Sequence, residues 1–177
     1  MKRLIAITLL LVALPVLAAL NIGDRAPVFT TQASLGGQVF TYSLADALRK
    51  GPVVLYFYPQ AFTEGCTIEA HEFAEAIDKY KALDATVIGV SNDAIETLNR
   101  FSVSECRGKF PVAADADKSI MKAYDAVLVP GMGYAKRISF VIAPDGTVVY
   151  AYSDLNPHKH VENTLSALQA WKARTKP

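Results

Sequence analysis

Residues 53–66 read VVLYFYPQAFTEGC, and their pattern indicates the fold class. The first six residues are all apolar, which is typical of a strand covered on both faces. Pro59 ends the run, because proline cannot continue a central strand. A helix is then expected over residues 64–83. Its apolar stripe consists of Cys66, Ala70, Phe73, Ile77 and Tyr80. A buried strand that leads directly into an amphipathic helix indicates an α/β protein.

The rest of the chain alternates strands and helices and closes on a hairpin. We expect an extended pair within 28–42, strands at 86–90 and 110–114, helices at 93–106 and 118–124, a hairpin of 137–143 with 147–152, and a last helix from Pro157 to near Trp171. Asp93 and Glu96 predict a capping box for the second helix. The predicted fold is an α/β sandwich with a central mixed sheet, flanking helices and an N-terminal β-hairpin.

The composition fits one globular domain. The chain has 177 residues, of which 51% are hydrophobic and 20% charged, and this length suits a single core. A formal net charge of +1 argues against a nucleic-acid partner and against an acidic tail. The two cysteines, Cys66 and Cys106, are too few for a disulfide-rich scaffold and form no zinc-binding pattern. We therefore expect neither a metal nor another cofactor.

The N-terminal segment has the pattern of a secretory signal peptide. Two basic residues precede a short apolar run, and small residues follow at the place where a signal peptidase cuts. We expect residues 1–18 to form the signal peptide, with cleavage after Ala18 or Ala19. Residues 19–177 then form one mature domain.

An uncleaved membrane anchor is the alternative for this segment. The apolar residues 4–20 number 17, the lower limit for a membrane span, and Pro15 interrupts them. We therefore expect an exported protein without stable membrane association after processing. In a Gram-negative bacterium it would be periplasmic.

Cys66 lies where a cysteine becomes reactive. Thr63 is placed as the N-cap of the helix, which makes Cys66 the third helical residue. Unpaired N–H groups and the positive end of the helix dipole favour a thiolate there. Gly65 lets other groups approach the backbone closely. Position alone leaves an inert core cysteine as an equal alternative, since Cys66 also belongs to the apolar stripe.

The chain resembles the peroxiredoxins of the AhpC/TSA superfamily. Pro59, Thr63 and Cys66 match the family signature Pro-x-x-x-Thr-x-x-Cys at the same strand-to-helix junction. Two further segments match in register, GDRAPVF at 23–29 and RISFVIAPDG at 137–146. The resemblance covers nearly all of the mature chain and is greatest to the peroxiredoxin-Q, or bacterioferritin comigratory protein, branch.

The resemblance implies a thioredoxin-like fold and a thiol-dependent peroxidase that reduces hydrogen peroxide and organic hydroperoxides. The thiolate of Cys66 would attack the peroxide and become a sulfenic acid. Thr63 and the backbone N–H of Cys66 would hold the peroxide. Arg137 would stabilise the thiolate and the charge on the leaving oxygen. Pro59 would shield the sulfur from water, and Glu69 would orient Arg137.

The resemblance leaves open which thiol reacts with the sulfenic acid. Many peroxiredoxin-Q proteins carry a resolving cysteine five residues after the first, where this chain has His71. Cys106 is the remaining candidate, although alignment on Phe110 places the second kind of resolver nearer Ser102. Cys106 would reach the first cysteine only after local unwinding of a helix. Otherwise the enzyme has one working cysteine and depends on an external thiol, thioredoxin-like or other.

Three readings other than a peroxidase are also open. A copper-handling module could use Cys66, Cys106 and some of the histidines, but it would lack the usual Cys-x-x-x-Cys and would leave Thr63 and Arg137 without roles. A disulfide oxidoreductase normally needs Cys-x-x-Cys. A binding domain could hold a static bridge between the two cysteines.

We expect no functional role for two further features of the sequence. His158 and His160 flank Lys159 at the start of the last helix, and we expect both on the surface, although His-x-His can bind metal. The glycines at 131 and 133 lack the context of a phosphate loop, so this stretch is expected to be a flexible connection.

Overall fold

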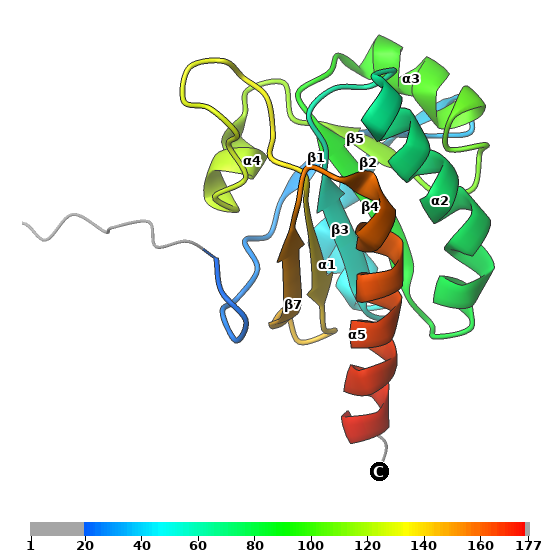
Figure 1. Ribbon diagram of the computed structural model, residues 1–177, viewed down its shortest axis with the longest axis vertical. Helices are drawn as coiled ribbons and strands as arrows, with labels where there is room; N and C mark the ends of the chain where they lie inside the picture. The colour runs from blue at the N-terminus through cyan, green and yellow to red at the C-terminus, as the bar shows by residue number, and fades with distance from the viewer. Residues whose placement is uncertain (1–19, 176–177) are drawn as a thin grey trace, which may run out of the picture.

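A seven-stranded mixed sheet forms the centre of the computed structural model, which describes residues 20–175 (Figure 1). In spatial order the strands are β2 Gln38–Ser43, β1 Thr30–Leu35, β5 Val112–Ala114, β4 Thr86–Ser91, β3 Val53–Phe57, β6 Ile138–Ile142 and β7 Val148–Ser153. β4 pairs in parallel with β3 and β5, and the other pairings are antiparallel. The predicted mixed sheet with an N-terminal hairpin is confirmed. The predicted cleavage site at Ala18 or Ala19 lies outside the described residues.

Helices cover both faces of this sheet. They are α1 Leu44–Leu48, α2 Glu64–Lys81, α3 Ile95–Ser104, α4 Ser119–Ala123 and α5 His160–Thr175, the last preceded by a 3₁₀ turn at Pro157–Lys159. Figure 1 shows α2 and α5 side by side in front of the sheet and α1 behind it.

β3 supplies both faces of the core because its side chains alternate. Val54 and Tyr56 belong to the hydrophobic cluster under α2, α3 and α5, whereas Leu55 and Phe57 belong to the cluster under α1 and α4. Every residue of β3 is buried. A Cβ atom on Gly89 of β4 would lie 2.7 Å from the Tyr56 ring, so the neighbouring strand must carry glycine there. The apolar run is therefore a central strand, as predicted.

The predicted capping box at Asp93 is wrong. The N-cap of α3 is Ala94, and no side chain caps this helix. The Asp93 carboxylate instead accepts hydrogen bonds from the backbone N–H of Ala61 and the hydroxyl of Ser91, both at 2.8 Å. Asp93 lies one residue too early to cap, and it joins the loop after β3 to the end of β4.

Other differences concern the lengths of elements. α1 was not predicted, because its five residues are too few to show a helical period. α3 ends at Ser104, before Cys106, and α5 continues to Thr175, beyond Trp171. The short helix α4 begins at Ser119, after Lys118 in a left-handed conformation. None of these differences changes the order of the strands.

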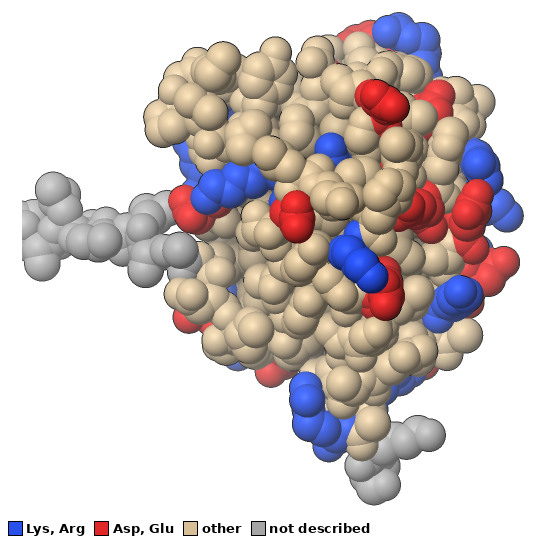
Figure 2. Space-filling model, in the orientation of Figure 1, with Lys and Arg blue, Asp and Glu red and all other residues tan. Residues whose placement is uncertain are grey.

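The surface carries charges of both signs. In the view of Figure 2, acidic and basic side chains are interspersed, most densely on the side of α2. Some form exposed ion pairs, such as Lys159 with Glu162 at 2.8 Å, which contribute little to stability. Within residues 20–175, no helix has both the length and the apolar character needed to cross a membrane.

Candidate functional site

The junction between β3 and α2 places Cys66 near the start of the helix in a buried position. Thr63 is the N-cap, as predicted, so Cys66 is the third helical residue, and its side chain is 1% exposed. The N–H of Thr67 donates to the carbonyl of Thr63 at 2.9 Å. The N–H of Cys66 precedes this bond and has no acceptor one helical turn back. Phe62 has a φ of 64°, the left-handed conformation in which the chain turns into the helix.

The side chain of Thr63 is free of any capping role. No side chain caps α2, and the Thr63 hydroxyl donates to the carbonyl of Gln60 at 2.9 Å. Because the hydroxyl hydrogen is used in this bond, the oxygen can accept a hydrogen bond from a ligand. Pro59, two residues after the end of β3, is half-buried. The bond from Ala61 to Asp93 fixes the loop that carries these residues.

Arg137 reaches this junction from the start of β6. One Nη of its guanidinium donates to the Cys66 Sγ at 3.5 Å, the other donates to the Glu69 carboxylate, and Nε donates to the carbonyl of Leu155 at 2.9 Å. The Arg137 side chain is almost fully buried. A Cβ atom on Gly65 would lie 3.0 Å from the nearest Nη, so the close approach expected at Gly65 is made by Arg137.

Burial and charge act in opposite directions on the Arg137–Glu69 pair. Glu69 lies one turn after Cys66 and is fully buried, which raises the pKa of Glu69 to about 8 although Arg137 lowers it. Burial also lowers the pKa of Arg137, but the charges of Glu69 and Cys66 outweigh this, and the net shift is upward. The guanidinium therefore stays charged beside the sulfur, whereas Glu69 can hold a proton near neutral pH.

Cys106 lies two residues beyond the end of α3. It is fully buried and, like Cys66, free; both belong to the hydrophobic cluster under α2 and α3. Burial, and to a smaller extent Glu105, raises the pKa of the Cys106 thiol, so the folded chain keeps it protonated. His71 pairs with Glu105 at 2.8 Å. Helix α2 thus contacts the segment immediately before Cys106.

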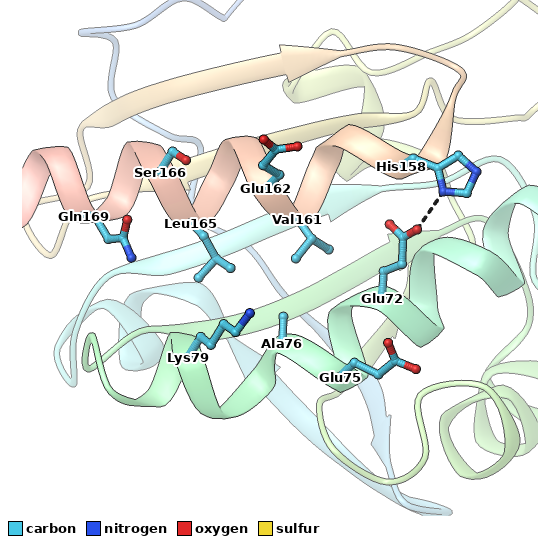
Figure 3. Close-up of a pocket in the computed structure, with 10 residues that line it drawn as sticks. All are labelled: Glu72, Glu75, Ala76, Lys79, His158, Val161, Glu162, Leu165, Ser166 and Gln169. Carbon is cyan, nitrogen blue, oxygen red and sulfur yellow. Dashed lines mark hydrogen bonds and ion pairs between the residues drawn. The ribbon is translucent and has the colours of Figure 1, made fainter.

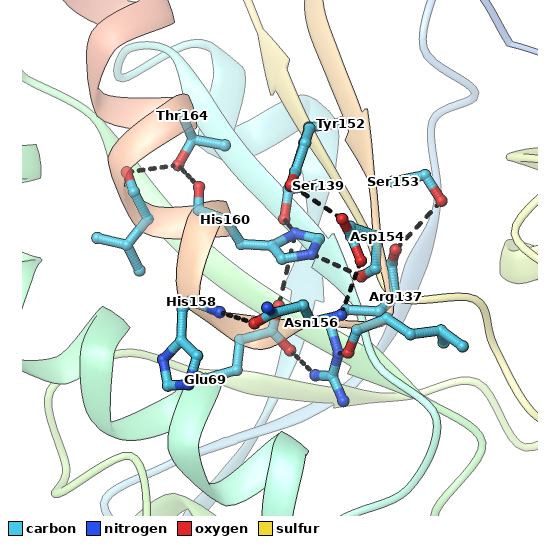
Figure 4. A network of polar contacts seen from close by, with 12 residues as sticks. Glu69, Arg137, Ser139, Tyr152, Ser153, Asp154, Asn156, His158, His160 and Thr164 are labelled. Atoms are coloured by element: carbon cyan, nitrogen blue, oxygen red, sulfur yellow. Dashed lines mark hydrogen bonds and ion pairs between the residues drawn. The ribbon is translucent and has the colours of Figure 1, made fainter.

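The expectation that His160 lies on the surface is wrong. His160 is fully buried, with Nε2 2.9 Å from the carbonyl of Asp154 and Nδ1 2.8 Å from the hydroxyl of Ser139 (Figure 4). Nδ1 also lies 3.6 Å from Oε1 of Glu69. A signal for this burial exists in the sequence, because one face of α5 repeats every four residues. That buried face consists of His160, Thr164 and Leu168.

His158 is exposed, as expected. It pairs with Glu72 at 2.7 Å across a groove between α2 and α5 (Figure 3). This groove is lined by Glu72, Glu75, Ala76, Lys79, His158, Val161, Glu162, Leu165, Ser166 and Gln169. It therefore lies apart from Cys66 and its contacts. In the described part of the chain, no three His, Cys, Asp or Glu side chains are grouped to hold a metal ion.

Similarity to known proteins covers most of the chain. The chain matches the AhpC/TSA family over residues 22–151. It is 30% identical over 151 residues to peroxiredoxin Bcp of Xanthomonas campestris pv. campestris, covering 82% of this chain and 92% of the relative. It is 35% identical over 158 residues to the putative peroxiredoxin YkuU of Bacillus subtilis, covering 84% and 87%. The crystal structure of a cysteine-to-serine mutant of PrxQ from Xylella fastidiosa superposes with a TM-score of 0.77 at 28% identity, covering 87% of this chain and 98% of that chain.

Proposed function

The chain belongs to the AhpC/TSA family and is a thiol-dependent peroxidase with a thioredoxin-like fold, and we propose that Cys66 is the residue that attacks the peroxide. One observation carries the proposal: the buried guanidinium of Arg137 donates to the Cys66 Sγ at the start of α2. A cationic donor and a helix N-terminus act together to stabilise a thiolate. A copper-handling module would leave this arrangement, and the Thr63 hydroxyl beside it, without a purpose.

In the proposed reaction the Cys66 thiolate attacks one oxygen of hydrogen peroxide or an organic hydroperoxide. The S–O bond forms as the O–O bond breaks, so the sulfur is oxidised to a sulfenic acid. The leaving oxygen takes a proton and departs as water or an alcohol. Arg137 stabilises the negative charge that develops on this oxygen, and Glu69 holds Arg137 in place.

The start of α2 offers hydrogen bonds to the peroxide itself. The Cys66 N–H can donate to a peroxide oxygen, because it precedes the first bond of the helix. The Thr63 hydroxyl can accept from the peroxide O–H, because its own hydrogen is donated to Gln60. Pro59, in the loop between β3 and α2, limits the access of water to the sulfur.

We further propose that Cys106 resolves the sulfenic acid within the same chain. Its thiol would attack the Cys66 sulfur, an S–S bond would form and water would leave. Both cysteines are buried, so this step requires local unwinding of the first turn of α2 or of the segment after α3. A thioredoxin-like protein or another thiol would then reduce the bridge. If Cys106 does not react, such a thiol resolves Cys66 directly.

We also propose that the enzyme is exported. The support is the signal-peptide pattern of residues 1–18. An oxidising compartment would favour rapid capture of the sulfenic acid by an internal thiol, before further oxidation. N-terminal sequencing of the protein recovered from the periplasmic fraction of a Gram-negative host tests this. A first residue that follows Ala18 or Ala19 is expected, and an intact start at Met1 would contradict it.

Replacing the reactive thiol tests the central proposal. Cys66→Ser should abolish the consumption of stoichiometric hydrogen peroxide in rapid-mixing experiments and leave the circular dichroism spectrum unchanged. Cys106→Ser serves as the comparison, because it removes the other thiol and keeps Cys66. A substantial residual rate in the Cys66 variant would refute the assignment.

A further inference from the structure

The Glu69 carboxylate has a hydrogen-bond partner on only one of its two oxygens. Oε2 accepts from Arg137, whereas Oε1 is buried and has no hydrogen bond among the described residues. Oε1 faces Nδ1 of His160 at 3.6 Å (Figure 4). A buried polar atom without a partner is strongly disfavoured, and its presence beside a second buried titratable group calls for an explanation.

The other contacts of His160 decide which ring nitrogen carries a proton. A carbonyl oxygen only accepts, so Nε2 donates to the carbonyl of Asp154 at 2.9 Å. In the neutral ring Nδ1 then presents a lone pair, which accepts from the hydroxyl of Ser139 at 2.8 Å. A charged Glu69 would direct an oxygen lone pair at this nitrogen lone pair. One proton between the two atoms replaces this repulsion with a hydrogen bond, after closure by roughly 0.5 Å. If the proton lies on Oε1, it competes with the Ser139 hydroxyl for the one lone pair of Nδ1; if it lies on Nδ1, the hydroxyl turns to accept from the N–H.

We propose that Glu69 and His160 share one proton, and that His160 is thereby a positioning residue for Arg137 and Cys66. With the proton present the Glu69–His160 pair is neutral. Glu69 then holds Arg137 through Oε2 without cancelling its charge, which remains available to the Cys66 sulfur. The inference rests on the proposed role of Cys66, but it concerns residues that do not touch the peroxide.

Loss of the shared proton has a definite consequence. Glu69 becomes a full carboxylate that neutralises Arg137, and its Oε1 is again left without a donor. The reaction of Cys66 with peroxide should therefore become slower above the pH at which the Glu69–His160 pair loses its proton. A lone thiol would behave in the opposite way, because higher pH increases its thiolate fraction.

The surroundings of the pair are consistent with a titration near neutral pH. The charged or titratable groups that face the pair come from several elements. They are Arg137 just before β6, Tyr56 of β3, Glu72 of α2, Asp154 after β7, Tyr152 of β7, whose ring packs edge-on at 4.9 Å, and His158 through its pair with Glu72. Burial is the largest influence on both members. It raises the pKa of Glu69 to about 8 and lowers the pKa of His160. Coupled groups this close lose their proton as a pair.

Nitrogen NMR of the histidine rings tests the shared proton directly, since the chain has only three histidines. In the reduced wild-type protein, Nδ1 of His160 should report one titration between about pH 6 and 10, while Nε2 stays protonated. Glu69→Gln should abolish this titration, because the amide places a permanent hydrogen against Nδ1. A His160 titration that persists in Glu69→Gln, or no change in the wild-type protein over this range, would overturn the proposal.

The functional test is the rate at which hydrogen peroxide oxidises Cys66, followed by quenched alkylation and peptide mass spectrometry. The wild-type rate should decline above the pH at which the Glu69–His160 pair loses its proton. His160→Leu should be roughly tenfold to hundredfold slower, the scale of a small misplacement in a site, and should lack the alkaline decline. His158→Asn is the matched control, because it changes the neighbouring exposed histidine and should keep the wild-type profile. A folded His160→Leu protein with the wild-type rate and profile would overturn the proposal.

The two failures can be told apart. If Cys66 of the wild-type protein is not oxidised by stoichiometric peroxide, the proposed function itself is wrong. If Cys66 is oxidised normally and neither Glu69→Gln nor His160→Leu alters the pH profile, only the shared proton is wrong. If His160→Leu does not fold, the NMR comparison of the wild-type protein with Glu69→Gln still decides the question.

Discussion

Replacing Arg137 with methionine should separate the chemistry of the site from its stability. The Arg137 side chain is 5% exposed and donates to the Leu155 carbonyl, the Glu69 carboxylate and the Cys66 Sγ. Methionine keeps much of the length and apolar volume of arginine but none of its donors. Packing around the β3–α2 junction should therefore change little, whereas three hydrogen bonds are lost.

The kinetic and stability effects should differ in size. Loss of a donor aimed at developing charge raises the barrier by about 3–4 kcal/mol, so we expect a rate roughly 100-fold to 1000-fold lower. Removing one partner of a buried pair costs about 3–5 kcal/mol of folding free energy if the other partner stays charged. Burial already raises the pKa of Glu69 to about 8, and loss of Arg137 raises it further, so Glu69 keeps its proton at pH 7. The cost should then fall to about 1–3 kcal/mol.

Three measurements test this prediction. Stopped-flow mixing with one equivalent of hydrogen peroxide gives the rate, alkylation of Cys66 as a function of pH gives its nucleophilicity, and urea unfolding gives the stability. Arg137→Met should slow the alkylation of Cys66 at neutral pH. The double variant Arg137→Met with Glu69→Gln is the control, because removal of the unpaired carboxyl should recover stability without recovering the rate.

One result would refute the reasoning. If Arg137→Met oxidised Cys66 within about threefold of the wild-type rate, with an unchanged alkylation profile, the contact at 3.5 Å would be structural only. A lower stability in the same variant would not rescue the proposed role, because the loss of a buried pair lowers stability whether or not it acts in the reaction.

The same geometry predicts the outcome of three other experiments. Gly65→Ala places a methyl group 3.0 Å from the Arg137 guanidinium, so oxidation by peroxide should slow about tenfold with little change in the urea midpoint; a wild-type rate would show that the displacement is harmless. Cys106→Ser should stop after one turnover and accumulate Cys66 sulfenic or sulfinic acid in peptide mass spectra; a stable sulfenic acid in the wild-type protein beside a free Cys106 would instead indicate a one-cysteine enzyme. Burial raises the pKa of Glu69 from 4.5 to about 8, so between these pH values the folded chain keeps a proton that the unfolded chain releases. The contribution of Glu69 to stability therefore falls as pH rises across this range, by at most about 1.4 kcal/mol per pH unit. Urea midpoints across this range should decline more steeply for the wild-type protein than for Glu69→Gln, and equal slopes would contradict the shift.

Local patterns in the sequence determined most of the fold. The apolar run at 53–58, bounded by Pro52 and Pro59, favoured a strand buried on both faces, and the period of the following residues indicated which face of α2 is buried. Gly36 and Gly37 supplied the turn of the N-terminal hairpin, where their φ angles are 54° and 85°. These features depend on residues a few positions apart, so they can be predicted from the sequence without the tertiary structure.

Other local features were ambiguous from the sequence alone. Asp93 fits a capping box by spacing, yet its carboxylate binds the Ala61 N–H from another loop. Phe62 carries no signal for its left-handed φ of 64°, which the surrounding structure imposes at the turn into α2. A short polar side chain can satisfy any nearby donor, and only the arrangement of the loops decides which one it meets.

The tertiary structure alone assembled the site around Cys66. The motif and the family resemblance identified Cys66 and Arg137, but the antiparallel pairing of β3 with β6 brings Arg137 to the junction across 71 positions of sequence. Phe57 is opposite Ile138, so Arg137 stands just beyond the strand end that leads into α2. His160 looked like a surface residue because hydrophobic patterns do not register a buried polar side chain. The four-residue spacing of His160, Thr164 and Leu168 marks a buried face of α5. That this face meets Glu69 depends on how α5 packs beside α2 on the sheet, and no pattern within α5 specifies a partner on another helix.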